Sequence, residues 1–363
     1  MDLPLDPNTT APVRAGEELD AAALERFLRD TLLGFEGPVT IEQFPSGHSN
    51  LTYLVRAGGG ERAGSIEMVL RRPPFGTTVK SAHDMGREFR VLSRLHTLYA
   101  PAPRPIAFCA DASVIGAPFY LMERRHGLVI RKEMPADLAA SPAALARLSA
   151  SIIDNLATLH GLDLQATGLA ELGKPEGYVT RQIEGWTRRW NDARTRDIAD
   201  VESVARWLAA NRPPESGASL IHNDYKLDNL MLDPADPTRI VAVLDWEMAT
   251  VGDPLMDFGT ALSYWVEAGD PREFLHLRFA PTAHAGFLTR REASLRYAGR
   301  TGRDVTNIAY YYVFGLFKVA VILQQIYYRW VKGLTRDDRF AAFDAMVRAL
   351  AAQAAATVQS GRI

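Results

Sequence analysis

The chain has 363 residues and a formal net charge of -2, which gives no support to general nucleic-acid binding. Its length exceeds that of one small compact domain and favours two lobes. The only cysteine, Cys109, excludes an intrachain disulfide and a cysteine-based zinc site. Residues 1–20 lack a signal-peptide pattern, and Lys318 interrupts the apolar run at 308–323, so we expect a cytoplasmic protein without a membrane partner.

Hydrophobic periodicity predicts mainly strands in the first third of the chain. A helix at 18–34 is indicated by Leu24 and Leu28 on one face, and a helix at 82–98 by Phe89 and Leu92. Strands are predicted at 40–44, 51–56, 65–71, 104–108 and 118–122.

After Gly127 the pattern becomes mainly helical, except for short strands and loops at 220–253. Helices are predicted at 143–160, 197–210, 306–332 and 337–358. Strands followed by helices predict an α+β fold with a small sheet-rich lobe and a large helical lobe. We place the boundaries at 1–35 for an N-terminal extension with a helix, 36–123 for the N-lobe and 124–363 for the C-lobe.

The pattern His222-x-Asp224-x-Lys226-x-x-Asn229, followed by Asp245, carries the chemistry of phosphoryl transfer. That reaction needs an oriented nucleophile and positive charge at the phosphates rather than covalent help from the protein. Asp224 can accept the proton of an acceptor hydroxyl, and Lys226 can contact the transferring phosphate. Asn229 and Asp245 offer the oxygen ligands that Mg²⁺ prefers. The alternative is a polar surface turn, in which Asp and Asn are also common.

These residues also carry a resemblance to a known family. Together with Asp245-Trp246-Glu247 and Gly252 to Asp257, they resemble the aminoglycoside phosphotransferase-like superfamily, which includes choline kinases, and more narrowly the kinase domains associated with acyl-CoA dehydrogenases. Supporting stretches follow in the same order as in that family: Ser46 to Tyr53, Val69 to Pro74, Arg87 to Phe89 and Val114 to Glu123. The resemblance implies a protein-kinase-like fold with a small antiparallel sheet in the N-lobe, and ATP and Mg²⁺ as cofactors.

The loop between the first two predicted strands is a candidate phosphate cradle. Its backbone N–H groups could bind the ATP phosphates, with the residues Ser46, Gly47, His48, Ser49 and Asn50. Because the loop has a single glycine, a plain hairpin turn is an equally good local interpretation.

Further nucleotide-binding residues are predicted on the third strand, the second helix and the hinge. Glu88 lies on an apolar helix face, where a carboxylate needs a cation. Kinases pair such a glutamate with a lysine on the third strand that contacts the phosphates, whereas this position is Arg71 here, and the resemblance implies that arginine is accepted. The alternative is that Arg71 and Glu88 form only a stabilising ion pair. Glu123 and Arg124 match the hinge whose backbone, the resemblance implies, binds adenine; an ordinary linker is also compatible with them.

Two further residues, Asp257 and His222, are expected to support the site. The resemblance implies that Asp257 braces the catalytic loop from the following helix, although a helix N-cap would account for it locally. His222 is expected to have a structural or orienting role rather than an acid–base one. His160 ends an apolar helix, and we interpret it as a favourable charge at the helix C-terminus.

The acceptor is expected to be a small molecule, and an anionic one. Residues 286–363 contain 12 Lys and Arg against 5 Asp and Glu, which does not suit a polycation. The resemblance implies a hydroxyacyl-CoA, particularly a 4-hydroxyacyl-CoA, whose phosphates basic residues could bind. Two alternatives are kept: a kinase for aminoglycosides or other small alcohols, and a pseudokinase that binds nucleotide without catalysis.

Overall fold

The computed structural model describes residues 9–35, 37–45, 50–58, 66–75, 84–335 and 337–363. The chain divides into two compact units, one formed by Met1–Val129 with Leu230–Ala249, the other by Ile130–Asn229 with Thr250–Ile363. The sequence prediction had assigned all of 124–363 to the C-lobe. The structure differs because β7 (Leu230–Leu232) and β8 (Ile240–Val243) pair with each other and pack on Val129 of the first unit.

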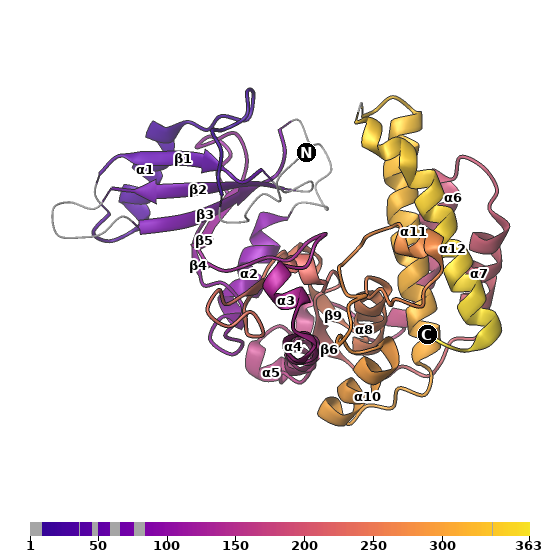
Figure 1. The fold of residues 1–363 in the computed structure, drawn as a ribbon. Coiled ribbons are helices and arrows are strands. Elements are labelled where there is room, and N and C mark those ends of the chain that lie inside the picture. The colour runs from indigo at the N-terminus through magenta and orange to yellow at the C-terminus, as the bar shows by residue number, and fades with distance from the viewer. Residues whose placement is uncertain (1–8, 36, 46–49, 59–65, 76–83, 336) are drawn as a thin grey trace. The chain divides into compact units, whose positions relative to one another are not determined.

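The first unit is built on a five-stranded sheet, whose neighbouring strands are all antiparallel (Figure 1). The strand order is β1-β2-β3-β5-β4. The strands are β1 (Val39–Gln43), β2 (Leu51–Ala57), β3 (Ile66–Arg72), β4 (Pro105–Cys109) and β5 (Phe119–Glu123). The predicted α+β, kinase-like fold class is thereby confirmed, with each predicted strand shifted by no more than a residue or so at its ends.

Two helices accompany this sheet. In α1 (Ala21–Thr31), Asp20 caps the first turn by accepting from Ala23 N, and Leu24 and Leu28 are buried against the sheet. In α2 (Met85–Leu95), the buried face includes the carboxylate of Glu88, which is 1% exposed. A buried charge of this kind requires a partner, and the site described below supplies it.

The second unit is mainly helical. Its helices are α3 (Ala136–Ala139), α4 (Pro142–His160), α5 (Leu164–Thr167), α6 (Tyr178–Ala193), α7 (Ala199–Ala210), α8 (Pro254–Ser263), α9 (Arg272–Leu275), α10 (Arg290–Thr301), α11 (Ile308–Val331) and α12 (Phe343–Ser360). β6 (Ser219–Ile221) pairs antiparallel with β9 (Thr250–Gly252). The sequence analysis did not assign α6 or α10 a range. Both carry arginines on the exposed face, opposite buried residues at helical spacing.

The longest helix, α11, is an interior element of this unit, and in Figure 1 it runs beside α12. Among the described residues it is the one helix long and apolar enough to cross a membrane, and 78% of its most apolar window is buried in the structure. It is longer than the apolar run read from the sequence. Its burial fits the expectation of a core helix.

Helices α8 and α11 approach each other at two glycines. A Cβ added to Gly259 would lie 2.3 Å from the carbonyl oxygen of Tyr311, and one added to Gly315 would lie 2.4 Å from the carbonyl oxygen of Gly259. Side chains larger than hydrogen are therefore excluded at this crossing. The contact matters for the site because α8 carries Asp257 and α11 carries Lys318.

We predict that Gly315→Ala destabilises the protein by about 1–3 kcal/mol, because overpacking at a backbone contact forces the helices apart. The measurement is the free energy of unfolding in denaturant. Gly299→Ala is the matched control, since a Cβ on this exposed helical glycine of α10 would meet nothing within 4 Å. It should stabilise by about 0.5–1 kcal/mol. Equal effects of the two substitutions would contradict the close-packed crossing.

Candidate active site

The loop that follows β6 positions the predicted catalytic residues of the second unit. β6 is fully buried, and the polar segment beginning at His222 leaves it abruptly and ends in a 3₁₀ turn at Leu227–Asn229. Asn223 has a φ of 68°, a left-handed conformation that costs free energy for a residue other than glycine. The surrounding contacts must therefore hold it in place.

Asp224, Lys226 and Asn229 meet on this loop, as the sequence predicts. The Lys226 Nζ lies 3.1 Å from Asp224 Oδ2, and Asn229 Nδ2 donates to the same oxygen at 2.9 Å. Asn229 Nδ2 also donates to the Asp224 backbone carbonyl at 2.9 Å. These bonds fix the orientation of the Asn229 amide. Its oxygen is then left to accept from, or coordinate, something else.

Asp257 braces the loop from α8. It is fully buried, with Oδ2 accepting from the His222 N–H at 2.8 Å and Oδ1 from the Asn223 N–H at 2.7 Å. The helix N-cap is instead Asp253, which accepts from Leu255 N. Burial alone would raise the pKa of Asp257, but hydrogen bonds and charge from His160 and His222 outweigh it and lower the pKa.

His160 belongs to this brace, which the sequence analysis missed. Its Nε2 lies 3.1 Å from Asp257 Oδ2, and its Nδ1 lies 2.7 Å from the Tyr297 hydroxyl. A carboxylate only accepts, so Nε2 carries a hydrogen. The interpretation as a helix-end charge was therefore incomplete. The sequence did contain one indication of this role: a histidine on the apolar face of the helix α4 needs a polar partner when it is buried.

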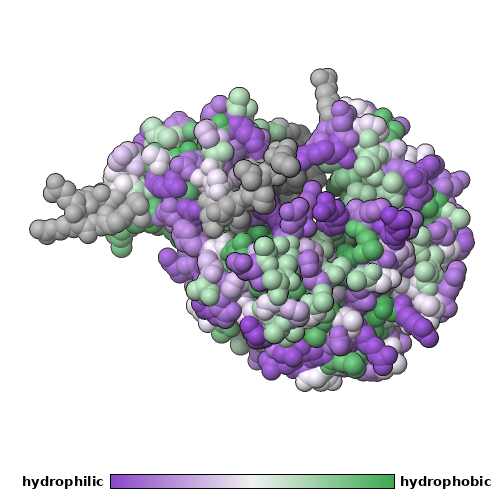
Figure 2. Space-filling model, viewed as in Figure 1, coloured by the Kyte–Doolittle hydropathy of each residue, from purple (hydrophilic) through white to green (hydrophobic). Residues whose placement is uncertain are grey.

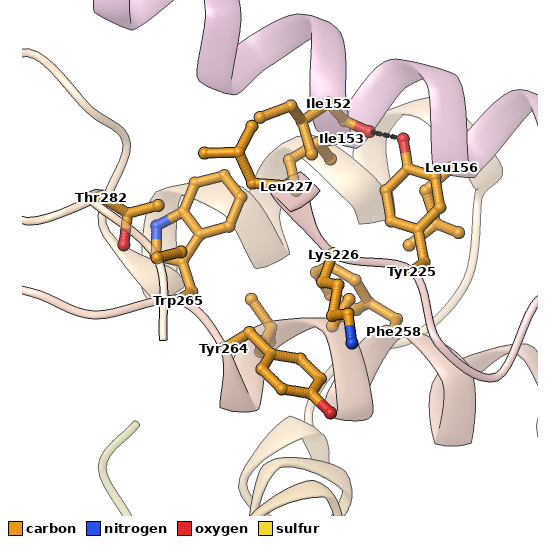
Figure 3. A pocket seen from close by; sticks show the side chains of 13 residues that line it. Ile152, Ile153, Leu156, Tyr225, Lys226, Leu227, Phe258, Tyr264, Trp265 and Thr282 are labelled. Atoms are coloured by element: carbon orange, nitrogen blue, oxygen red, sulfur yellow. Dashed lines mark hydrogen bonds between the residues drawn. The ribbon is translucent and has the colours of Figure 1, made fainter. Parts of the chain in front are cut away.

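Lys226 and Tyr264 lie at the edge of an apolar pocket in the second unit (Figure 3). Ile152, Leu227 and Trp265 are among its lining residues, whereas the ammonium of Lys226 and the hydroxyl of Tyr264 point to one side together. The Lys226 ammonium stands 5.2 Å from the centre of the Tyr264 ring. Burial would lower the pKa of Lys226, but Tyr264 and the carboxylates of Asp224 and Asp228 raise it, so this lysine is cationic.

In the first unit, Arg71 is the centre of an acidic cluster. Its Nη1 lies 3.1 Å from Glu88 Oε1, and its Nη2 lies 2.8 Å from Asp245 Oδ1 and 3.8 Å from Glu247 Oε2. Burial would lower the pKa of Arg71, but Glu88 and Asp245 are among the groups that raise it well above its ordinary value. The predicted pairing of Arg71 with Glu88 is present. The additional contact with Asp245 was not predicted.

Glu88 also fixes the backbone beside Asp245. Asp245 follows β8 with a φ of 68° and precedes the 3₁₀ turn Trp246–Met248. The N–H of Trp246 donates to Glu88 Oε1 at 3.2 Å. One helix carboxylate therefore holds both a cation and the turn that carries Asp245.

The candidate phosphate loop is described only at Asn50. Ser46, Gly47, His48 and Ser49 lie outside the described residues, so their predicted role as a phosphate cradle stays a prediction. The Asn50 side chain is buried, and its Nδ2 donates to Glu247 Oε2 at 2.6 Å. Glu247, which the sequence analysis did not single out, thus joins this loop to the segment after Asp245.

At the predicted hinge, the side chains make structural contacts. Glu123 Oε1 accepts from the backbone N–H of Arg104 at 2.8 Å and lies 2.7 Å from Arg125 Nε. Arg124 Nη1 lies 2.8 Å from Glu67 Oε1. Any recognition of adenine here would therefore use backbone groups, and that role stays a prediction.

The site residues fall into two sets, one in each unit. Arg71, Glu88 and Asp245 come together in the first unit, and Asp224 and Asn229 come together in the second. For magnesium, the donor chemistry fits: Asp245 offers a carboxylate that is 31% exposed, and Asn229 offers an oriented amide oxygen. Within the described residues there is no cluster of three or more His, Cys, Asp or Glu suited to a metal. Mg²⁺ usually needs fewer protein ligands than that, because it keeps several waters.

Comparison with known proteins places the chain among phosphotransferases. The model of the phosphotransferase enzyme family, APH, matches residues 40–293. A crystal structure of a putative aminoglycoside phosphotransferase from Ralstonia eutropha is 33% identical, with a TM-score of 0.79, and the match covers 94% of this chain and 99% of that one.

Two curated relatives are longer proteins. Acyl-CoA dehydrogenase family member 10 of Mus musculus is 35% identical over 333 residues, which are 90% of this chain and 30% of that protein. Family member 11 of Homo sapiens is 32% identical over 351 residues, which are 94% of this chain and 43% of that protein. The chain thus spans less than half the length of these relatives.

We predict that Arg71 and Glu88 are energetically coupled, because each is buried and removing either leaves an unpaired charge. A double-mutant cycle with Arg71→Met and Glu88→Gln should give a coupling of about 0.5–3 kcal/mol in the free energy of unfolding. The same cycle in ATP affinity tests the nucleotide role. The exposed pair Arg296 and Asp154 is the control, with an expected coupling below about 1 kcal/mol. Strict additivity at Arg71 and Glu88 would disprove the interaction.

Proposed function

The chain belongs to the phosphotransferase enzyme family, and within it we propose that the protein transfers the γ-phosphoryl group of ATP to the hydroxyl of a hydroxyacyl-CoA, such as a 4-hydroxyacyl-CoA. The observation that carries the phosphotransferase chemistry is the loop on which Asp224, Lys226 and Asn229 converge, with Asp257 holding its backbone. Such a loop presents a proton acceptor, a cation and a metal ligand from one rigid segment, as phosphoryl transfer requires.

In the proposed reaction, Asp224 accepts the proton of the acceptor hydroxyl while that oxygen forms a bond to the γ-phosphorus. The bond from the γ-phosphorus to the bridging oxygen of ADP breaks, and the leaving oxygen keeps the electron pair. Lys226 lies beside Asp224, so its ammonium can steady the charge on the transferred group. Bound Mg²⁺ would neutralise phosphate charge, with Asn229 and Asp245 as its protein ligands.

Arg71 is proposed to orient the nucleotide through its neighbours. Its guanidinium already contacts Glu88 and Asp245, and its Nε has no hydrogen-bond partner within the described part of the chain. An Arg differs from a Lys in offering a planar fork of donors, so it can hold two carboxylates at once, and its third nitrogen, Nε, is buried. The proposed effect of Arg71 on the nucleotide therefore runs through Asp245, and the ATP-affinity cycle above tests it.

The acceptor class rests mainly on the named relatives. The segments that match this chain occur in longer proteins called acyl-CoA dehydrogenase family members, and we therefore take an acyl-CoA as the class of acceptor. The alternative of an aminoglycoside acceptor is kept because the Ralstonia structure is named a putative aminoglycoside phosphotransferase. Retention of Asp224, Lys226, Asn229 and Asp245 argues against a pseudokinase.

The excess of basic residues in 286–363 gives this acceptor less support than the sequence alone would indicate. Figure 2 shows hydrophilic side chains spread between smaller hydrophobic areas on the visible face of the second unit. Several of the arginines are paired with acids: Arg290 with Asp270, Arg296 with Asp154, Arg339 with Asp337, and Arg348 with Asp344. Their charge is largely compensated within the protein, so they do not by themselves form a CoA-binding surface.

We predict a higher kcat/KM with a 4-hydroxyacyl-CoA than with the matching free hydroxy acid or a kanamycin-like amine. Binding energy from the CoA part, which is remote from the reacting hydroxyl, helps to place that hydroxyl. The measurement is ADP formation, with phosphorylated product confirmed by mass. The unsubstituted acyl-CoA of equal length is the control, because it has no hydroxyl to phosphorylate. Equal rates on acid and thioester, or preference for the amine, would overturn the acceptor assignment.

We predict that Asp224→Asn lowers kcat by about 10²–10⁴-fold, the usual contribution of a general base, with little change in nucleotide affinity. Asp228→Asn is the control on the same loop, because its carboxylate stands 4.0 Å from Lys226 Nζ and has no proposed role. It should keep most of the turnover. Near-normal kcat in Asp224→Asn at saturating substrate would remove Asp224 from the mechanism.

A further inference from the structure

Lys318 is a buried cation in the most apolar helix of the protein. It is 2% exposed and is the first charged residue of α11, which has no other before Arg329. Burying an ammonium is costly unless polar partners compensate for the lost water. A hydrophobic side chain of the same size would be buried in α11 at a lower cost in free energy. We therefore expect the ammonium of Lys318 to have a specific polar partner.

That partner is the backbone of Asn223. The Lys318 Nζ donates to the Asn223 carbonyl oxygen at 2.7 Å. Two other elements hold the same residue: Asp257 of α8 accepts from its N–H at 2.7 Å, and the Tyr178 hydroxyl of α6 donates to its Oδ1 at 3.3 Å. Asn223 is therefore held from three helices, at its N–H, its carbonyl and its side chain.

The carbonyl of Asn223 belongs to the peptide group that leads into Asp224. Because Asn223 has a φ of 68°, this peptide plane is set by a conformation that the residue adopts at a cost. Asp257 fixes the peptide group on one side of Asn223. The peptide group on the other side is held at its carbonyl by Lys318 and at its N–H by His222, whose Nδ1 accepts from Asp224 N at 3.2 Å. The direction in which the Asp224 side chain leaves the backbone depends on the second of these.

Both negative and positive groups surround Lys318, so no single partner neutralises its charge. The carboxylates of Asp257 and Asp224 favour its protonated form, whereas the cations Lys226 and Arg189 oppose it, and the Trp186 ring lies 5.9 Å from its Nζ. Burial is the largest effect and lowers the pKa of Lys318 to about 8. The ammonium thus feels the charge of Asp224 on the loop and of Asp257 on α8, without an ion pair to either within 4.0 Å among the described residues.

We propose that Lys318 is a positioning residue for Asp224: it holds the Asn223–Asp224 peptide group in its left-handed arrangement and so aims the carboxylate at the acceptor hydroxyl. This inference rests on the proposed role of Asp224 as proton acceptor. A misplacement of about 1 Å of a reacting group can lower a rate by about 10²-fold. A residue that does not touch the substrate can therefore govern turnover from the interior of α11.

Lys318→Met tests the inference, because methionine keeps the apolar stem and removes the ammonium. We expect kcat to fall by about 10²-fold while KM for ATP changes little. Gln324→Met is the matched control: Gln324 is also buried on α11, and its Nε2 donates to a backbone carbonyl, that of Ala193, at 2.9 Å, away from the catalytic loop. It should lose comparable stability but keep kcat when rates are divided by the folded fraction.

Lys318→Arg supplies the test if Lys318→Met fails to fold. It keeps a cation that can donate to the Asn223 carbonyl, and its guanidinium does not lose its proton in the working range. We expect partial recovery of kcat, and an alkaline loss of activity that begins near the pKa of about 8 in the parent protein but lies higher in this variant. The proposal would be overturned if Lys318→Arg had both the kcat of the parent protein and the same loss of activity at alkaline pH.

A crystal structure of Lys318→Met, or of Lys318→Arg if the first does not fold, separates this proposal from the proposed function. The expected result for Lys318→Met is a rotated Asn223–Asp224 peptide, and for Lys318→Arg a peptide held by the guanidinium. An unchanged peptide in Lys318→Met, or an unbound but unchanged one in Lys318→Arg, would disprove the positioning role whatever the activity. Full activity of Asp224→Asn would instead remove the proposed mechanism and leave the structural result standing.

Discussion

The buried carboxylate of Asp257 is the interaction on which the site of the second unit depends. A charge without water must be satisfied by hydrogen bonds, and here two successive backbone N–H groups and the His160 ring supply them. In the arrangement that meets this requirement, Asn223 is left-handed. Asp257 thus fixes the backbone on the N-terminal side of Asn223, and the contact of Lys318 with the next peptide group contributes to the placement of Asp224.

The first unit uses the same physical device. Glu88 of α2 accepts from the backbone of Trp246, just after the left-handed residue Asp245, as Asp257 of α8 accepts from the backbone beside left-handed Asn223. In each unit a helix-borne acid holds a turn that carries a second acid. The difference lies in the compensating group, since Glu88 has a guanidinium and Asp257 has an imidazole. Rigid helices thereby fix loops that would otherwise be the mobile parts of the molecule.

Features that depend on residues close together in the sequence could be predicted from the sequence. The strands of the sheet and the loop motif from His222 to Asn229 were predictable because nearby residues specify them. The signals are the alternation of apolar and polar residues, the turn residues and the spacing of the polar residues. His160, Lys318 and Glu247 could not be assigned roles, since their partners lie far away in the sequence and only folding brings them together. The excess of arginines near the C-terminus is likewise offset in part by acids distant in sequence, as in the pairs Arg290 with Asp270 and Arg296 with Asp154. The amino-acid composition gives the number of charged residues, whereas the ion pairs in the folded protein determine how many of them stay uncompensated.

The first unit is discontinuous in sequence, which has a consequence for the order of events during synthesis. Its last piece, Leu230–Ala249, follows a hundred residues that belong to the second unit. Val129 and Met231 share one small apolar core, and Arg71 has its second carboxylate at Asp245. A nascent chain that has emerged only to Asn229 therefore lacks the Asp245 carboxylate that pairs with Arg71 and the strands β7 and β8 that pack on Val129. Chaperone binding and proteolysis would act on that interval, before either unit is finished.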